Sequence, residues 1–394
     1  MVSVAEIKNN SSRPRLLLVV PALHQGGFER VCVLTARLLA PFYEITIAAF
    51  TTEHTDYDVT GLTVVDLGLP SRAGRLGKLV TWQARVRALK RLKKKLGIRI
   101  SYSLGQTANL ANVFARAGDR CIGSIRSYQD MQNPWKIRLF CRRFDQVICC
   151  SAAIEEELRR DYGCGSAVTL YNPVSVPERA ALAEGRAALF NEREDIRRFT
   201  ERHAVLFMSM GREDDVKGFW HLIKAFAVLR REAGDVARAG LVIIGLGDFA
   251  EYKALASELG IAEHVLFTGV LHEPHPLLQM ADGYILTSIN EGFPNALVEA
   301  MALGVPVIAA DCPTGPREIL ISGAGAPCGV LLPPLSGEKD LSAEHIPEED
   351  IHLAQSMRAL LESPREEAGR AGKVRAADFS MERYRERCRE FLGI

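Results

Sequence analysis

Residues 290–307 read NEGFPNALVEAMALGVPV, and this stretch decides how the chain is built. An acid stands before a Gly-Phe-Pro turn, a helical segment follows and ends near Gly304, and a β-branched strand comes next. Two carboxylates, Glu291 and Glu299, flank the start of that helix, where free backbone N–H groups can meet an anion. The pattern therefore predicts a loop–helix–strand unit that carries a polar site. A buried helix with two solvated acids is the alternative that this stretch alone leaves open.

The same alternation of strands and helices runs along the whole chain. Helical periodicity appears at residues 29–39 and 80–96, between runs of Val, Ile and Leu. These runs are typical of buried parallel strands and lie at residues 15–20, 44–50, 62–66, 99–103, 121–125 and 146–150, and again at 205–209, 241–245, 265–267, 284–287, 305–310 and 329–332. We therefore predict an α/β protein with two Rossmann-like, doubly wound domains.

The boundary between the two domains is expected at the turn-forming pair Asn172 and Pro173. We assign residues 1–172 to an N-terminal domain, residues 173–380 to a C-terminal domain, and residues 381–394, an amphipathic segment, to a final helix. Residues 178–203 are charged and helical in composition, which predicts one or two added helices to which we assign no role.

The composition is that of an ordinary globular protein, with 394 residues, 47% of them hydrophobic and 25% charged. No apolar run approaches the roughly 20 residues that span a bilayer, and residues 1–15 are polar, unlike a secretory signal. The nine cysteines are scattered and include no Cys-x-x-Cys pair. We therefore expect a reduced, cytoplasmic chain without a zinc framework.

Charge is distributed unevenly along the chain. Residues 1–172 carry a net charge of about +11, which leaves about −10 for the rest of a chain whose total is +1. We find no basic stripe interleaved with aromatic residues, so nucleic acid is not expected as a partner. The asymmetry favours a phosphate-bearing substrate or an anionic membrane surface.

Two further loops follow predicted strands and carry chemistry. The first contains Gly26 and Gly27, which would let the backbone approach a ligand closely, although a simple turn explains this pair equally well. It is neither a dinucleotide-binding Gly-x-Gly-x-x-Gly loop nor a Walker loop. The second, residues 210–218, contains Arg212 and Lys217, two cations that can hold a diphosphate. Pairing of these cations with neighbouring acids is the alternative.

In this order, the three loops resemble those of the retaining GT-B glycosyltransferases of family 4. The resemblance covers nearly the whole chain, because it includes Gly-Gly-x-Glu at residues 26–29, Gly-Arg and Lys-Gly within residues 211–218, Glu-x7-Glu at Glu291 and Glu299, and the loop at residues 311–319. It implies two Rossmann-like domains that face a central cleft, an acceptor domain before a donor domain, and a C-terminal helix that returns to the N-terminal domain.

The resemblance also implies a role for each candidate residue. Glu291, Arg212 and Lys217 would form the catalytic group, in which the two cations hold the donor diphosphate and Glu291 contacts hydroxyls of the transferred sugar. Glu299 would accept hydrogen bonds from the ribose. The remaining donor contacts would come from Gly26, Gly27, Gly269, Val270, Phe293, Pro294, Asn295 and Ala296.

The implied reaction moves a hexose or N-acetylhexosamine, with retention, from a nucleotide sugar to a hydroxyl of a glycan or lipid-linked oligosaccharide in bacterial cell-surface polysaccharide biosynthesis. The variant at residues 292–295 resembles that of enzymes using UDP-sugars, so a UDP-linked donor is expected. We expect no cofactor and no metal, because Arg212 and Lys217 would stabilise the leaving diphosphate. A nucleotide-sugar 2-epimerase or hydrolase on the same fold, and a non-catalytic nucleotide-sugar-binding protein, are the rival hypotheses.

Retention without an obvious nucleophile favours a front-face mechanism, in which the leaving phosphate assists deprotonation of the acceptor. Glu291 as a covalent nucleophile is the competing hypothesis. Many family members place a His in the N-terminal domain where this chain has Ser124 and Arg126, so the general base stays unidentified. Arg126 can offer a phosphate or sugar contact, or an ion pair with Asp130, but it cannot accept a proton.

A basic helix is predicted in the N-terminal domain. Its apolar face is expected to pack on the sheet, and its cations are expected to surround that face; they are Arg85, Arg87, Lys90, Arg91, Lys93, Lys94 and Lys95. Residues 135–143 add aromatic residues and four more cations. We expect this basic surface to meet an anionic leaflet, which would make the protein peripheral on the cytoplasmic face of the inner membrane.

Overall fold

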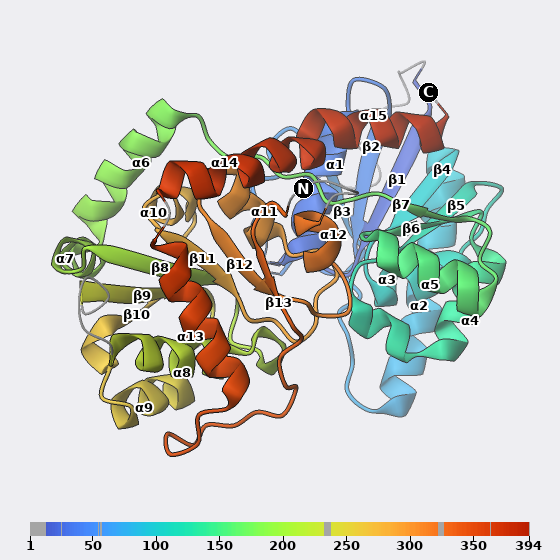
Figure 1. Cartoon of the computed structure of the whole chain (residues 1–394). Coiled ribbons are helices and arrows are strands. Elements are labelled where there is room, and N and C mark those ends of the chain that lie inside the picture. Colours follow the sequence, from blue (N-terminus) through green and yellow to red (C-terminus); the bar gives the residue numbers. More distant parts are fainter. Residues whose placement is uncertain are drawn as a thin grey trace. The chain divides into compact units, whose positions relative to one another are not determined.

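The computed structural model describes residues 13–393 except 25, 54, 56, 232–237, 322–326 and 363. Residues 1–12 lie outside the described residues. They include most of the polar N-terminal stretch that we described as unlike a secretory signal. The chain divides into two compact units, Met1–Pro173 with Met381–Ile394, and Val174–Ser380 (Figure 1). Each unit is an α/β domain with its own sheet and its own core.

The first unit contains, within its described residues, a seven-stranded parallel sheet in the order β3-β2-β1-β4-β5-β6-β7. Its strands are β1 (Arg15–Val20), β2 (Glu44–Ala49), β3 (Thr63–Asp66), β4 (Ile100–Ser103), β5 (Arg120–Ile125), β6 (Gln146–Cys149) and β7 (Ala167–Thr169). Its helices are α1 (Gly27–Leu39), α2 (Arg75–Leu96), α3 (Gln106–Phe114), the 3-10 helix η1 (Tyr128–Gln132), α4 (Pro134–Arg143), α5 (Ala152–Tyr162) and α15 (Met381–Leu392).

Strand β1 shows why a continuous apolar run forms a central strand. Leu16 and Leu18 pack on one face of the sheet with residues of α1 and α15, whereas Leu17 and Val19 pack on the other face with residues of α2 and α3. All four side chains are fully buried. A parallel strand covered on both faces needs apolar side chains at every position, which is the pattern in the sequence.

The second unit contains, in its described part, a six-stranded parallel sheet in the order β10-β9-β8-β11-β12-β13. Its strands are β8 (Val205–Met210), β9 (Ala239–Ile244), β10 (Val265–Gly269), β11 (Gly283–Leu286), β12 (Val307–Ala310) and β13 (Val330–Leu332). Its longer helices are α6 (Arg179–Glu192), α7 (Glu194–Arg202), α8 (Phe219–Arg230), α9 (Ala250–Glu258), α11 (Asn295–Ala302), α13 (Glu348–Leu360) and α14 (Arg365–Ala376). Short helices are η2 (Asp215–Lys217), η4 (Ala262–His264), α10 (His275–Leu278), α12 (Pro316–Leu320) and η5 (Ala377–Phe379).

Of the two added helices, α7 contacts the edge strand β10, whereas α6 packs against α10, beside which it is drawn in Figure 1. Arg193, between the two helices, donates from Nη2 to the carbonyl oxygen of Thr268 in β10 at 3.0 Å. A Cβ on Gly185 of α6 would lie 2.8 Å from Pro276 at α10, so the helix packs closely there. Part of the segment to which we assigned no role, Arg193 and α7, therefore lies against an edge strand, which otherwise presents unpaired backbone groups.

Helix α15 packs on α1 of the first unit, although it follows the second unit in sequence. The hydroxyl of Tyr384 lies 2.7 Å from Oγ1 of Thr35, and Tyr43 donates to the carbonyl oxygen of Leu392 at 3.3 Å. The predicted α/β fold with two doubly wound parallel sheets is confirmed.

The prediction that all the cations of α2 lie around its outer face is wrong for two of them. Lys93 is buried, and its Nζ lies 2.8 Å from Oδ2 of Asp119 with neither side chain exposed. Arg85 is also buried, and it donates from Nε and Nη2 to the carbonyl oxygen of Leu69. Both side chains lie on the packed face of the helix, because Arg85 is four residues before the buried Leu89 and Lys93 is four residues after it.

Candidate functional site

The second sheet has a topological switch point between β8 and β11. The chain winds outward in one direction from β8 to β10 and in the other direction from β11 to β13. Ligands of open α/β sheets bind at the carboxyl ends of the strands beside such a point. The loops after β8 and β11 carry Lys217 and Glu291, so the topology brings these two candidate residues together.

The loop after β8 is held against the segment after β11 by hydrogen bonds to two of its backbone carbonyl oxygens. The amide of Ile289 donates to the carbonyl oxygen of Val216 at 2.8 Å, and Thr287 donates from Oγ1 to the carbonyl oxygen of Lys217 at 3.0 Å. Gly218 has a φ of 59°, and a Cβ there would lie 2.3 Å from the oxygen of Thr287. Only glycine fits this turn, which fixes where the Lys217 side chain begins.

Lys217 and Glu291 form an ion pair at the centre of the site. Nζ of Lys217 lies 2.6 Å from Oε1 of Glu291, and the two side chains are 21% and 11% exposed. Ser288 donates to the same carboxylate oxygen at 2.7 Å, and Thr314 donates to the backbone oxygen of Glu291 at 2.5 Å. One carboxylate oxygen of Glu291 thus has two partners and its backbone oxygen has a third, while part of the pair stays open to solvent.

Arg212 is placed differently from Lys217. Its side chain is 67% exposed, and Nη2 approaches Oδ2 of Asp214 only to 3.6 Å. Asp214 instead caps η2, where its carboxylate accepts from the amide of Val216 at 3.2 Å. Neighbouring acids therefore do not bind Arg212 tightly, and its guanidinium is exposed at the same loop as Lys217.

The helix α11 begins beside this pair. Phe293 is buried, and the centre of its ring lies 5.3 Å from the centre of the Phe379 ring. Phe293 can therefore contact a ligand through its backbone. Asn295 and Ala296, the first residues of α11, are partly exposed, and Pro294 precedes them as the N-cap. Glu299 follows one turn later with a side chain that is 2% exposed. A carboxylate buried this deeply requires polar partners.

Two other predicted donor contacts lie on the same unit. Gly269 ends β10 with a φ of 72° and accepts from the amide of Gly245 at 3.1 Å. Val270 follows it with a side chain that is 38% exposed. These two residues lie at the carboxyl edge of the sheet, as do Lys217 and Glu291, because the strands are parallel.

Gly26 and Gly27 belong to the first unit, after β1. Gly27 begins α1, and Gly26 is held by the hydroxyl of Tyr57, which accepts from its amide at 3.0 Å and donates to its carbonyl at 2.7 Å. A Cβ on Gly26 would lie 2.3 Å from Oε2 of Glu29. The glycine pair therefore forms an ordered loop at the carboxyl end of a central strand.

The side chains of Ser124 and Arg126 point into the first unit. Ser124 is fully buried and donates to the carbonyl oxygen of Ser103 at 3.0 Å. The three guanidinium nitrogens of Arg126 are buried without a hydrogen bond, and Asp130 accepts from the backbone amide of Arg126 instead. The suggested ion pair between Arg126 and Asp130 is therefore not formed.

Sequence reasoning missed three residues that interact with Glu291. Ser288 and Thr314 hold it directly, as described above, and they follow β11 and β12, where the ends of parallel strands converge. Tyr284 of β11 is fully buried, and burial followed by the charges of Glu291 and Glu299 raises its pKa. The position of these residues at strand ends was the available signal.

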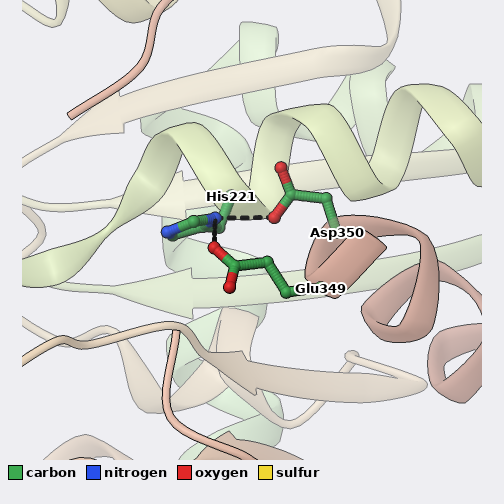
Figure 2. Close-up of side chains that lie close together, drawn as sticks. All are labelled: His221, Glu349 and Asp350. Carbon is green, nitrogen blue, oxygen red and sulfur yellow. Dashed lines mark hydrogen bonds and ion pairs between the residues drawn. The ribbon is translucent and has the colours of Figure 1, made fainter. Parts of the chain in front are cut away.

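One group of three His, Asp and Glu side chains in the described part of the chain lies close enough to share a metal ion (Figure 2). Nδ1 of His221 lies 2.6 Å from Oδ1 of Asp350 and 3.5 Å from Oε1 of Glu349, and Nε2 lies 3.0 Å from the oxygen of Ser336. Ligand atoms of one tetrahedral zinc ion lie about 3.3 Å apart, so 2.6 Å is a direct hydrogen bond. Burial opposes the charge of His221, but the hydrogen bond to Asp350 raises its pKa. The group is an ion pair that fastens α13 to α8.

Comparison with known proteins matches both units. Residues 25–177 match the model described as Glycosyltransferase Family 4, and residues 191–368 match the model described as Glycosyl transferases group 1. An uncharacterized glycosyltransferase of Methanocaldococcus jannaschii is 31% identical over 199 residues, which are 46% of this chain and 48% of that protein. The lipopolysaccharide 1,6-galactosyltransferase of Salmonella typhimurium is 41% identical over 88 residues, which are 21% of this chain and 24% of that protein. The matches thus span about half of the first relative and about a quarter of the second.

A longer match is to the N-acetylgalactosamine-N,N'-diacetylbacillosaminyl-diphospho-undecaprenol 4-alpha-N-acetylgalactosaminyltransferase of Campylobacter jejuni. It is 24% identical over 323 residues, which are 77% of this chain and 83% of that protein. Among solved structures, Anabaena HepE in complex with UDP-glucose superposes with a TM-score of 0.73 at 18% identity, covering 96% of this chain and 99% of HepE. At this identity the likeness shows the fold.

Proposed function

Because the chain belongs to the GT-B glycosyltransferases of family 4, we propose that it transfers a hexose or N-acetylhexosamine from a UDP-sugar to a hydroxyl of a glycan or lipid-linked acceptor in bacterial cell-surface polysaccharide biosynthesis. The observation that carries the proposal is the group at the switch point of the second sheet. Lys217 is paired with Glu291 there, Arg212 is exposed on the same loop, and Glu299 lies one turn into the adjacent helix.

This group suits the binding of a sugar diphosphate. Lys217 and Arg212 supply positive charge for the diphosphate without a metal ion, and the N-terminal backbone of α11 supplies donors. Glu299 has the burial and the place expected of a carboxylate that binds ribose hydroxyls. Glu291, next to Lys217, would contact hydroxyls of the transferred sugar, with Asn295 and Ala296 close by in sequence.

Retention at the anomeric carbon is part of the proposal. Glu291 is engaged by both Lys217 and Ser288, which suits a carboxylate that orients sugar hydroxyls better than one free to attack carbon. We therefore favour front-face attack, in which the leaving phosphate accepts the proton of the acceptor hydroxyl. Arg212 and Lys217 would stabilise the negative charge that develops on that phosphate.

Support for the donor and the acceptor comes from similar proteins. HepE of Anabaena was crystallised with UDP and with UDP-glucose, which favours a uridine diphosphate donor. The Campylobacter jejuni relative is named for an acceptor built on diphospho-undecaprenol, which favours a lipid-linked acceptor here.

Calorimetric titration with UDP, GDP and ADP, followed by transfer assays with the matching sugar nucleotides and lipid-linked glycan acceptors, tests the proposal. We expect UDP to bind most tightly and the product to keep the anomeric configuration of the donor. Product formed from donor alone, as free sugar or as its C2 epimer, at a rate that acceptor does not change would support a hydrolase or epimerase instead. Nucleotide binding without any turnover would support a non-catalytic protein.

We also propose that the protein contacts a membrane through the first turns of α2, a more specific location than the sequence predicted. No helix in the described ranges is long and apolar enough to cross a bilayer. The first turns of α2, however, expose Leu76, Leu79 and Val80 by 80%, 49% and 54%. Arg75 and Lys78 are exposed beside them. Apolar side chains flanked by cations are suited to an anionic interface.

Flotation with liposomes tests this membrane contact. The full chain should float with anionic vesicles and remain unbound with neutral ones, and the double variant Leu76→Ser, Leu79→Ser should lose most of the binding. Val374→Ser is the matched control, because Val374 is 73% exposed on α14 of the other unit. Equal flotation of the double variant and the control would refute this location.

A further inference from the structure

A buried histidine lies beside Glu299, and neither the sequence motifs nor the proposed reaction uses it. His275 begins α10 with 6% of its surface exposed. Its Nε2 lies 3.5 Å from Oε2 of Glu299, and its Nδ1 lies 3.9 Å from the exposed Glu273. Neither ring nitrogen makes a hydrogen bond, although both are buried.

This arrangement is costly unless it serves the site. A buried polar group without a hydrogen bond loses the free energy of its hydration, and a histidine has two such groups. Nε2 faces a carboxylate at ion-pair distance, so the polarity of the ring is directed at one oxygen of Glu299. A phenyl ring would fill a similar volume without that cost.

We propose that His275 is a positioning residue for nucleotide binding. Its Nε2, 3.5 Å from Oε2 of Glu299, forms a hydrogen bond to that oxygen when the nucleotide binds, so that the other carboxylate oxygen accepts from the hydroxyls of the ribose. This inference rests on the proposed function, because it assigns His275 to the donor site through Glu299. It adds to that function a specific chemical role, the recognition of the ribose diol.

Two substitutions separate this role from packing. His275→Gln places an amide N–H near the position of Nε2, whereas His275→Asn reproduces only the position of Nδ1. Both are smaller than histidine and polar, so their effects on folding should be similar. His272→Asn, at an exposed residue of the same loop, is the control for the loop itself.

The measurement compares UDP with 2′,3′-dideoxy-UDP by calorimetry, because only UDP has the ribose diol. The unaltered protein should prefer UDP by about tenfold or more, the value of one hydrogen bond to a charged group. His275→Gln and His272→Asn should keep most of this preference. His275→Asn should bind the two nucleotides almost equally, with an unchanged affinity for the dideoxy compound.

The possible failures are distinguishable. If the unaltered protein binds no nucleoside diphosphate, the proposed function fails and this inference fails with it. If it binds UDP and the dideoxy compound equally, the nucleotide site stands but recognition of the diol is refuted. If His275→Asn discriminates as well as the unaltered protein does, Glu299 does not depend on His275 and the inference is overturned.

Discussion

Replacing Glu291 with glutamine should strengthen nucleotide binding while it weakens transfer. Lys217 Nζ lies 2.6 Å from Glu291 Oε1, and Ser288 donates to the same oxygen at 2.7 Å. A donor diphosphate must compete with this carboxylate for the charge of Lys217. Glutamine keeps the shape and an acceptor oxygen but removes the negative charge, so Lys217 becomes available to phosphate.

The magnitude follows from the contact that is weakened. A hydrogen bond that involves charged groups contributes about 1.5–3 kcal/mol and a neutral one about 0.5–1.5 kcal/mol. The difference, about 1 kcal/mol, corresponds to roughly fivefold tighter binding of UDP. The exposure of the two side chains, 21% and 11%, places the expected effect at the lower end of the range, because solvent screens part of the attraction. Transfer should fall by at least about tenfold, the value of one charged hydrogen bond to the sugar.

Calorimetry with UDP and initial rates of transfer measure the two effects separately. Glu258→Gln, on an exposed face of α9, is the control that removes one negative charge from the same unit. It should change neither quantity. If Glu291→Gln weakened UDP binding tenfold, the carboxylate would be supporting the diphosphate rather than competing for Lys217, and the reasoning would be wrong.

Three further predictions concern stability. Lys93→Met should lower the free energy of unfolding by about 3–5 kcal/mol in urea titrations, because it leaves a buried aspartate unpaired, whereas the exposed Lys94→Met should change it by less than about 0.5 kcal/mol. Gly218→Ala should lower the free energy of unfolding by about 1–3 kcal/mol and weaken UDP binding, because the turn that carries Lys217 needs a positive φ. A normal UDP affinity would contradict this. Burial lowers the pKa of both His203 and His264, and Nε2 of His203 lies 3.0 Å from Nδ1 of His264. The unfolded chain therefore binds more protons than the folded protein, so the free energy of unfolding should have its full value above about pH 6.5 and should fall as the pH decreases below it. This fall should be less steep in His264→Gln. An unchanged slope would refute the assignment.

Local patterns in the sequence carried most of the information about the fold. The apolar run of β1 predicted a strand buried on both faces, and its side chains do pack alternately on the two faces. The same kind of reasoning misplaced Lys93, because residue type was given more weight than helical position. Lys93 is four residues after Leu89 and three before Leu96, which are both buried, so the spacing itself held the signal.

Other features had no local signal. His275 is one of two histidines in a short segment, and its burial beside Glu299 depends on how α10 and α11 pack. Residues 178–203 were recognisably helical, but only the strand order shows that β10, which Arg193 and α7 contact, is an edge strand. Strand order and helix packing depend on contacts between residues distant in sequence, which periodicity does not encode.

The sequence by itself determined the elements and the chemistry of the candidate site. Alternating strands and helices, the turn glycines and the acids and cations of three loops are local properties, because they depend on neighbouring residues. Only the tertiary structure decided which charges meet. Lys217 and Glu291 are 74 residues apart, and they form an ion pair because the sheet places β8 beside β11, so that the loops after these two strands emerge at the same edge. The partner of a charged side chain is set by that topology, and Lys217 pairs with Glu291 rather than with the acids next to it in sequence.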